Sequence, residues 1–295
     1  MEQCTTGVIR ANGVDFHYYE AGTGPLVLCM HGFPDSPWTY RYLLPALAGA
    51  GYRAVAPFMR GFAPTAVPAD WRYDMRTIGE DFNALHAALG GAGDAVLIAH
   101  DWGAVAAYAA LSSAPSNWRR AVISNIPPMP VFGQVVFTYE QLKRFFYIFF
   151  FQYDCAEAFL LDNDLEFLRG LWHDWSPGYD ASFDVEKAQA CLRDPAHLKA
   201  ALGYYRTVFN PRHFGRPDFV AAGAEVWGRP LPQSTLYFHG LRDGCLAIDR
   251  TLAAQIPACM GPGSETEILD DAGHFLIVEQ PARVNGRILE FIGRR

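Results

Sequence analysis

The residues best placed to do chemistry lie between Val96 and Ala104, where the chain reads VLIAHDWGA. An apolar, strand-like run ends at His100, Asp101 follows, and an alanine-rich, helix-like run begins just beyond it. Small residues stand two positions before and two positions after the aspartate, as a tight strand-to-helix elbow requires, because larger side chains there would strike the backbone. A carboxylate at such an elbow can attack an electrophilic carbon and form an ester, so Asp101 is the candidate nucleophile.

A second motif, HGFP at residues 31–34, directly follows the apolar run Leu26–Met30. In folds built around such an elbow, the turn after an earlier strand faces the nucleophile. Its backbone N–H groups can hold a developing oxyanion together with the N–H of the residue after the nucleophile. We therefore predict an oxyanion hole formed by the amides of Phe33 and Trp102, and we expect Pro34 to lie beside the substrate.

A general base is expected in a loop late in the chain, and His274 in the sequence GHF has that position. Histidine can take a proton from water near neutral pH. Asp243 follows the preceding strand-like run and is the candidate acid that orients this histidine. Asp249 is the main competitor, although its position also suits a helix N-cap. The chain order nucleophile, acid, base is then Asp101, Asp243, His274, which is the usual order for this kind of elbow.

The elements that must position these groups are short apolar strand-like runs alternating with helical patterns. This rhythm predicts parallel strands joined by right-handed crossovers. Helices are expected at Thr77–Leu89 and Pro281–Ile292. The strand-like runs are Val14–Glu20, Leu26–Met30, Ala54–Pro57, Val96–His100, Ala121–Asn125, Thr235–His239 and Glu267–Leu269.

Strand signals fade after Pro127, and helical runs rich in aromatic residues continue to about Pro230. Proline-rich segments at 126–130 and 228–232 bound this region. We therefore predict a helical cap, residues 129–228, inserted into one core that comprises residues 1–128 and 229–295.

The cap contains two tyrosine-bearing segments, FYIFFFQ at 146–152 and LGYYR at 202–206. A phenol above a carboxylate nucleophile could donate a hydrogen bond to a leaving oxygen. The opening of an epoxide needs such acid assistance, because its oxygen otherwise leaves as an alkoxide. Aromatic residues at helical spacing are equally typical of a packed core, so most of the phenylalanines are expected in the core or the pocket wall.

Together these motifs, with RGF at 60–62, resemble the epoxide hydrolases of the α/β hydrolase fold, and the resemblance covers essentially the whole chain. Haloalkane and haloacetate dehalogenases share the elbow and the HGFP turn, so the cap is the discriminating part. Tyr147 stands five residues before Gln152, and Tyr205 directly precedes Arg206, as the two acid tyrosines of the epoxide hydrolases do. Tyr204 is a neighbour that could be the true donor.

The resemblance implies a mostly parallel eight-stranded sheet flanked by helices, with the inserted cap. It also implies hydrolysis of an apolar or aromatic epoxide to a vicinal diol through a covalent aspartyl ester. In this reading Asp101, Asp243, His274, Tyr147 and Tyr205 are catalytic, and no cofactor or metal is needed. The expected substrate-binding residues are Tyr204, Phe151, Trp172 and Pro34.

Two other functions remain open from the sequence. A carbon–halide hydrolase would use the same aspartate–histidine–aspartate triad, and the indole of Trp102 could then cradle the halide together with a tryptophan of the segment WHDW at 172–175. A non-catalytic protein could sequester an apolar small molecule in the aromatic pocket, although binding alone would have no need of His274 and Asp243.

Composition limits the partners. The chain has 295 residues, 51% hydrophobic residues and a net charge of −7, which argues against nucleic acid and anionic membranes as partners. The apolar run near 145–151 is far shorter than a membrane span, and the N-terminus shows no secretory signal. We expect a cytoplasmic monomer or homodimer with small-molecule substrates. Six scattered cysteines fit reduced thiols: Cys4, Cys29, Cys155, Cys191, Cys245 and Cys259.

Overall fold

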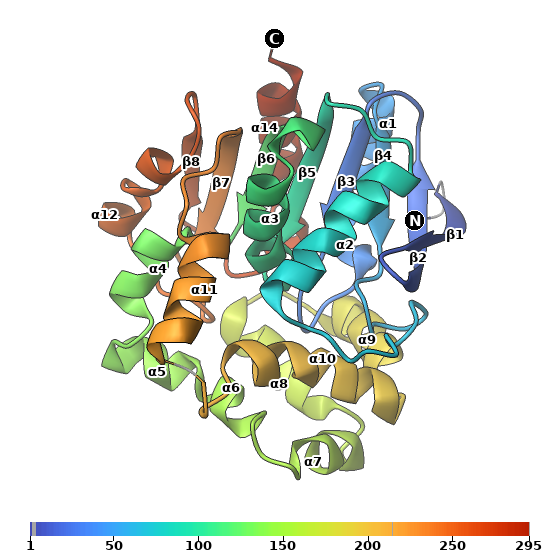
Figure 1. Cartoon of the computed structure of the whole chain (residues 1–295). Coiled ribbons are helices and arrows are strands. Elements are labelled where there is room, and N and C mark those ends of the chain that lie inside the picture. Colours follow the sequence, from blue (N-terminus) through green and yellow to red (C-terminus); the bar gives the residue numbers. More distant parts are fainter. Residues whose placement is uncertain (2–3, 214, 295) are drawn as a thin grey trace.

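The computed structural model describes residues 1, 4–213 and 215–294, and it is built on one eight-stranded sheet (Figure 1). The strand order is β1-β2-β4-β3-β5-β6-β7-β8. Strands β3 to β8 pair in parallel, as the alternating pattern predicts, so the fold class is confirmed. The strands are β1 (Thr5–Ala11), β2 (Val14–Ala21), β3 (Leu26–Met30), β4 (Arg53–Pro57), β5 (Ala95–His100), β6 (Trp118–Ser124), β7 (Ser234–Gly240) and β8 (Glu265–Leu269).

The antiparallel part of the sheet is the hairpin of β1 and β2, with β2 also antiparallel to β4. Strand β1 was not predicted from the sequence. It is an edge strand whose residues are largely exposed, so it has no apolar run to mark it. The seven predicted strands are confirmed, with ends that differ by a few residues.

Helices cover both faces of the sheet because side chains alternate along each strand. In β5, Val96 and Ile98 belong to the core under α1 (Leu43–Gly49) and α14 (Pro281–Gly293). Leu97 and Ala99 belong to the core on the opposite face, under α2 (Met75–Ala88) and α3 (Trp102–Ser113). Short elements complete the core: η1 (Pro37–Tyr40), η2 (Pro115–Asn117), α12 (Arg250–Ala253), η3 (Ile256–Cys259) and α13 (Leu276–Glu279).

Between β6 and β7 the described chain forms helices alone, and most of them lie across the carboxyl ends of the strands (Figure 1). The last of them, α11, returns beside α3. The division into a core and a cap at 129–228 stays a prediction. The eight helices are α4 (Met129–Val135), α5 (Tyr139–Arg144), α6 (Phe146–Phe150), α7 (Ala156–Asp162), α8 (Glu166–Trp175), α9 (Ser182–Leu192), α10 (Pro195–Val208) and α11 (Pro217–Trp227).

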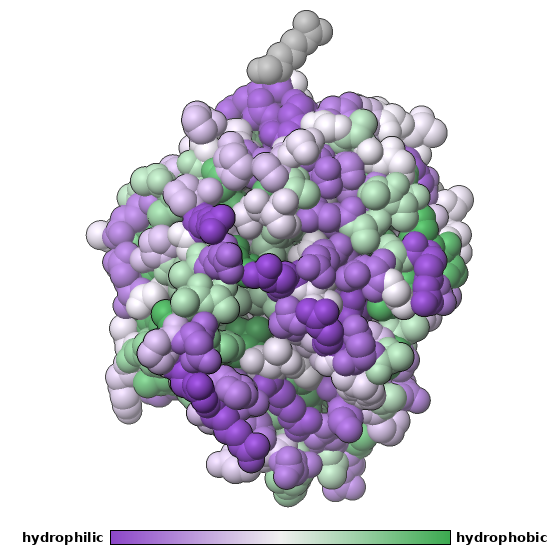
Figure 2. Space-filling model, viewed as in Figure 1, coloured by the Kyte–Doolittle hydropathy of each residue, from purple (hydrophilic) through white to green (hydrophobic). Residues whose placement is uncertain are grey.

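On the face shown in Figure 2, hydrophilic residues cover most of the surface, with apolar residues in smaller patches between them. Among the described residues, every helix is too short or too polar to pass through a bilayer.

The loop after β4 is anchored to α2 by a buried ion pair. The guanidinium of Arg60 forms two hydrogen bonds with the carboxylate of Asp81, and both side chains are about 98–99% buried. Asn12 donates a further hydrogen bond of 2.7 Å to Asp81. The backbone carbonyl of Arg60 accepts a hydrogen bond from the Tyr204 hydroxyl at 2.9 Å. This loop therefore connects α2 to α10.

Substitution of Asp81 by asparagine should lower the free energy of unfolding by about 3–5 kcal/mol, because it leaves the buried Arg60 charge without its partner. The matched control is Asp70→Asn, which removes a carboxylate that is 56% exposed and 3.8 Å from the same guanidinium. That change should cost less than about 1 kcal/mol in urea-induced unfolding. Equal losses in the two variants would contradict the assignment.

Candidate active site

The elbow at Asp101 has the strained backbone that the sequence pattern predicts. Asp101 stands between β5 and α3 with φ 51° and ψ −121°, a backbone conformation that residues other than glycine rarely adopt. A Cβ on Gly103 would lie 2.3 Å from the Met30 carbonyl oxygen, and one on Gly32 would lie 2.2 Å from Asp101 Oδ1. Only glycine fits at these two positions, so β3 and the nucleophile approach each other closely.

A backbone N–H group binds one oxygen of Asp101. The Phe33 N–H donates a hydrogen bond of 2.7 Å to Asp101 Oδ1. Trp102 is the first residue of α3, so its N–H has no acceptor within the helix. The Phe33 amide thus lies at the Asp101 carboxylate, and the part of the Trp102 amide in an oxyanion hole stays a prediction.

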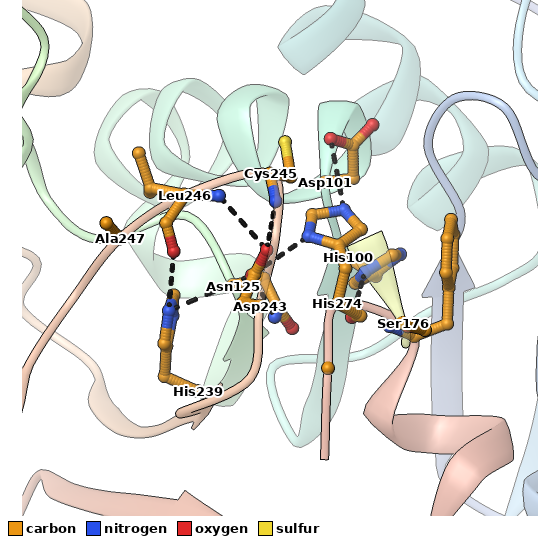
Figure 3. Close-up of polar contacts among 12 residues, drawn as sticks. His100, Asp101, Asn125, Ser176, His239, Asp243, Cys245, Leu246, Ala247 and His274 are labelled. Carbon is orange, nitrogen blue, oxygen red and sulfur yellow. Dashed lines mark hydrogen bonds and ion pairs between the residues drawn. The ribbon is translucent and has the colours of Figure 1, made fainter. Parts of the chain in front are cut away.

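The structure brings His274 between two carboxylates (Figure 3). Its Nδ1 is 3.0 Å from Asp243 Oδ2, and its Nε2 is 3.6 Å from Asp101 Oδ2. The competing residue, Asp249, instead caps α12 by accepting a hydrogen bond of 2.8 Å from the Leu252 N–H. His274 therefore lies between Asp243 and Asp101 and is close to both.

Asp243 accepts hydrogen bonds from three groups besides His274. Its Oδ1 accepts hydrogen bonds from the N–H groups of Cys245 at 2.7 Å and Leu246 at 3.0 Å. Its Oδ2 also accepts a hydrogen bond of 2.7 Å from the Asn125 side chain. Sequence reasoning missed Asn125, although a polar residue just after the buried strand β6 was a usable signal.

Burial and the neighbouring carboxylates determine whether His274 carries a positive charge. Burial alone would lower the pKa of His274, but the charges and hydrogen bonds of Asp243 and Asp101 outweigh it and raise the pKa to about 10. Burial would raise the pKa of Asp243, but the adjacent His274 holds it well below its usual range. The resting site is therefore an imidazolium between two carboxylates. The neighbouring His100 is different, because burial lowers its pKa to about 3.

The end of helix α8 is hydrogen-bonded to the loops that carry Asp243 and His274. The carbonyl oxygen of Trp175 accepts hydrogen bonds from the N–H of His274 at 2.9 Å and from the N–H of Gly244 at 3.1 Å. Its indole ring lies 5.0 Å from the His274 ring and 5.1 Å from the Tyr147 ring. No sequence pattern indicated these two hydrogen bonds, because their acceptor is a backbone carbonyl, which any residue has.

Tyr147 and Tyr205 differ from Tyr204 in the contacts of their hydroxyl groups. The rings of Tyr147 and Tyr205 lie 5.7 Å apart. The Tyr147 hydroxyl is 3.5 Å from the Cys245 sulfur, and the buried Tyr205 hydroxyl has no partner among the described residues. Burial, with the nearby Asp101 charge, holds both of their pKa values well above 10, so both phenols are protonated. Tyr204 instead donates to the Arg60 carbonyl, so the geometry favours Tyr205 as the second acid.

Asp101, Tyr147 and Tyr205 line one small cavity of about 40 Å³. Its polar wall contains Asp101, Tyr147 and Tyr205, and its remaining wall is almost entirely apolar. Sequence reasoning missed Cys245, which also borders it. The full lining is Asp101, Trp102, Val105, Ile126, Phe132, Phe145, Tyr147, Ile148, Tyr205, Val208, Phe209, Trp227 and Cys245.

The four expected substrate-binding residues, Tyr204, Phe151, Trp172 and Pro34, lie outside this lining. Phe151 packs behind it, with its ring 5.1 Å from that of Tyr205. The Trp172 indole N–H donates a hydrogen bond of 2.8 Å to the Pro34 carbonyl, and its ring stacks on Phe275. That N–H is therefore already used, and a halide cradle between Trp102 and Trp172 is not formed.

Comparison with known proteins agrees with this geometry. Residues 25–281 match the model of the α/β hydrolase fold family. An epoxide hydrolase of Caballeronia sordidicola is 40% identical over 316 residues, which cover 96% of this chain and 92% of that protein. Epoxide hydrolase A of Mycobacterium tuberculosis is 29% identical, with 98% and 97% covered. The solved structure of an epoxide hydrolase from an endophytic Streptomyces has a TM-score of 0.81 at 26% identity, with 99% and 96% covered.

The chain therefore belongs to the α/β hydrolase fold family, among its epoxide hydrolases. The resemblance seen in the sequence motifs is confirmed.

The raised pKa of His274 is testable by NMR titration of ¹⁵N-labelled histidine side chains. The ring should stay doubly protonated through neutral pH and titrate near pH 10. In Asp101→Asn the midpoint should fall by about 1–3 pH units, because one of the two negative charges is gone. His100 is the internal control and should stay neutral throughout. A wild-type midpoint near 6.5, or no change in Asp101→Asn, would contradict the charge arrangement.

Proposed function

We propose that the chain hydrolyses an apolar or aromatic epoxide to a vicinal diol through a covalent ester on Asp101. The observation that carries this proposal is that one cavity is lined by the side chains of Asp101, Tyr147 and Tyr205. A nucleophile for carbon and two proton donors for oxygen are the groups that ring opening requires.

In the first step, Asp101 Oδ2 attacks a ring carbon of the epoxide. The new carbon–oxygen bond is the ester bond, and the bond from that carbon to the ring oxygen breaks. The electron pair goes to the ring oxygen, which takes a proton from one of the two phenols. Asp101 Oδ1, held by the Phe33 N–H at 2.7 Å, becomes the carbonyl oxygen of the ester.

Ester formation also prepares the base. It removes the negative charge of Asp101, which is one of the causes that raise the pKa of His274. The imidazolium can then release its proton, which replaces the proton that the tyrosine donated. His274 becomes a neutral base, still oriented by Asp243 through its Nδ1.

In the second step, His274 takes a proton from water, and the water oxygen attacks the ester carbonyl carbon. The negative charge that develops on the carbonyl oxygen is stabilised by the amides of Phe33 and Trp102. When this intermediate collapses, the diol leaves with the proton held by the imidazolium, and Asp101 is left as a carboxylic acid. Transfer of that proton from Asp101 to His274 restores the resting charges. The overall change is addition of one water to one epoxide.

The lining of the cavity supports an apolar substrate. Burial of apolar surface contributes about 25 cal/mol per Å², and the wall beyond the phenols offers aromatic and aliphatic side chains. A bulky hydrocarbon or aryl tail suits this wall better than a charged one. The helical segment 129–228 supplies most of this wall and both phenols, which supports its role as the cap.

Beyond this activity, we propose a cytoplasmic enzyme that acts on small molecules without a cofactor. All six cysteines are free thiols, which is consistent with a reducing compartment. A monomer and a homodimer fit the chain equally well.

The role of the phenols is tested by Tyr205→Phe. This variant should reduce kcat/KM for an aryl epoxide about 100-fold, because it removes a proton donor to the leaving oxygen. The measurement is diol formation by equal amounts of folded variant and wild-type enzyme. Diol formation at the wild-type rate in Tyr205→Phe would contradict the role of this phenol.

The matched control is Tyr204→Phe, which removes a hydroxyl from the next position of the same helix. That hydroxyl donates to the Arg60 carbonyl, so its loss should cost about 1 kcal/mol of stability and less than tenfold in kcat/KM. Epoxide opening that depends on Tyr204 and not on Tyr205 would refute the assignment.

A further inference from the structure

The cavity contains two buried polar groups that the protein leaves without hydrogen-bond partners. Among the described residues that line it, the unpartnered buried atoms are the Tyr205 hydroxyl and the indole nitrogen of Trp227. The hydroxyl has a role in the proposed mechanism, next to Asp101. The Trp227 N–H has none.

Trp227 is the last residue of α11 and is 4% exposed. Its ring lies 4.9 Å from the Phe132 ring, which in turn contacts Phe145, and Phe145 contacts Tyr147. Two aromatic rings therefore stand between Trp227 and the nearer phenol. Trp227 therefore lines the cavity at a distance from the phenols, where the tail of a substrate would lie rather than the reacting ring.

An unpaired donor is unusual for a tryptophan so deeply buried. The indole N–H of Trp118 donates a hydrogen bond of 2.9 Å to Asn83, and that of Trp172 donates one of 2.8 Å to Pro34. A buried N–H without an acceptor is costly, and such groups in native proteins call for an explanation. A ligand that brings its own acceptor would remove this cost.

We propose that the Trp227 N–H is a substrate-recognition site for a neutral oxygen acceptor on the tail of the epoxide, such as an ether or a carbonyl. The inference rests on the proposed function and deepens it. Indole is a donor only, so its partner must be an acceptor. The lining contains no lysine or arginine, and a carboxylate or phosphate there would be buried without a counter-charge, so the acceptor is neutral.

The test uses two pairs of substrates in which an oxygen replaces a methylene. The distal pair is 4-methoxyphenyl glycidyl ether and 4-ethylphenyl glycidyl ether, which differ beyond the aryl ring. The proximal pair is phenyl glycidyl ether and 1,2-epoxy-4-phenylbutane, which differ close to the epoxide. Each enzyme is characterised by the ratio of kcat/KM values within a pair, which does not depend on the amount of folded protein.

The wild-type enzyme should prefer the oxygen-containing member of the distal pair by about three- to tenfold, the effect of one neutral hydrogen bond. Trp227→Phe keeps an aromatic ring and removes the donor, so this ratio should fall to about one. Trp118→Phe, which removes an indole N–H remote from the cavity, should leave it unchanged. The proximal ratio should not depend on Trp227.

The inference is overturned if the wild type shows no preference in the distal pair, or if Trp227→Phe retains it. If the wild type hydrolyses none of the four epoxides, the proposed function fails and the inference falls with it. Turnover of both members of the distal pair at equal rates overturns the inference alone.

Discussion

The structure depends on one electrostatic arrangement, an imidazole buried between two carboxylates. His274 is fully buried, and it lies 3.0 Å from Asp243 and 3.6 Å from Asp101. Two negative charges so close together are tolerable because a proton on His274 and the hydrogen bonds to each carboxylate compensate them. Esterification of Asp101 would remove one charge and turn the compensating cation into a base. The order of the two chemical steps thus follows from charge balance.

The cap takes part in this arrangement as well as covering it. The Trp175 carbonyl, at the end of a cap helix, accepts hydrogen bonds from both the acid loop and the base loop. The indole of the same residue packs against His274 and Tyr147. The cap also supplies the two phenols, so displacement of α8 would disturb the proton donors and the base together. In the proposed mechanism the segment 129–228 and the rest of the chain therefore act together.

Much of this could be predicted from the sequence, because the elbow, the buried strands and the catalytic loops have strong local signals. Small residues stand two positions before and two positions after Asp101, as a tight turn requires. Asp243 and His274 each follow a strand that the apolar pattern predicts. The residues that were missed have features that no sequence pattern shows. Trp175 acts through its backbone carbonyl, and Trp227 shows its free N–H only in three dimensions. Tyr204 and Tyr205 are adjacent, yet successive helical residues point about 100° apart, so sequence alone could not choose between them. Strand β1 escaped prediction because an exposed edge strand needs no apolar pattern.

The most direct measurement is a single turnover in H₂¹⁸O with enzyme in excess over an aryl epoxide, followed by mass analysis of the diol and of the peptide that contains Asp101. An ester intermediate predicts ¹⁸O in the Asp101 carboxylate and none in the first diol released, because the diol takes its oxygen from the enzyme. ¹⁸O in that first diol, with Asp101 unlabelled, would mean that water attacks the epoxide directly, and it would contradict the covalent role of Asp101.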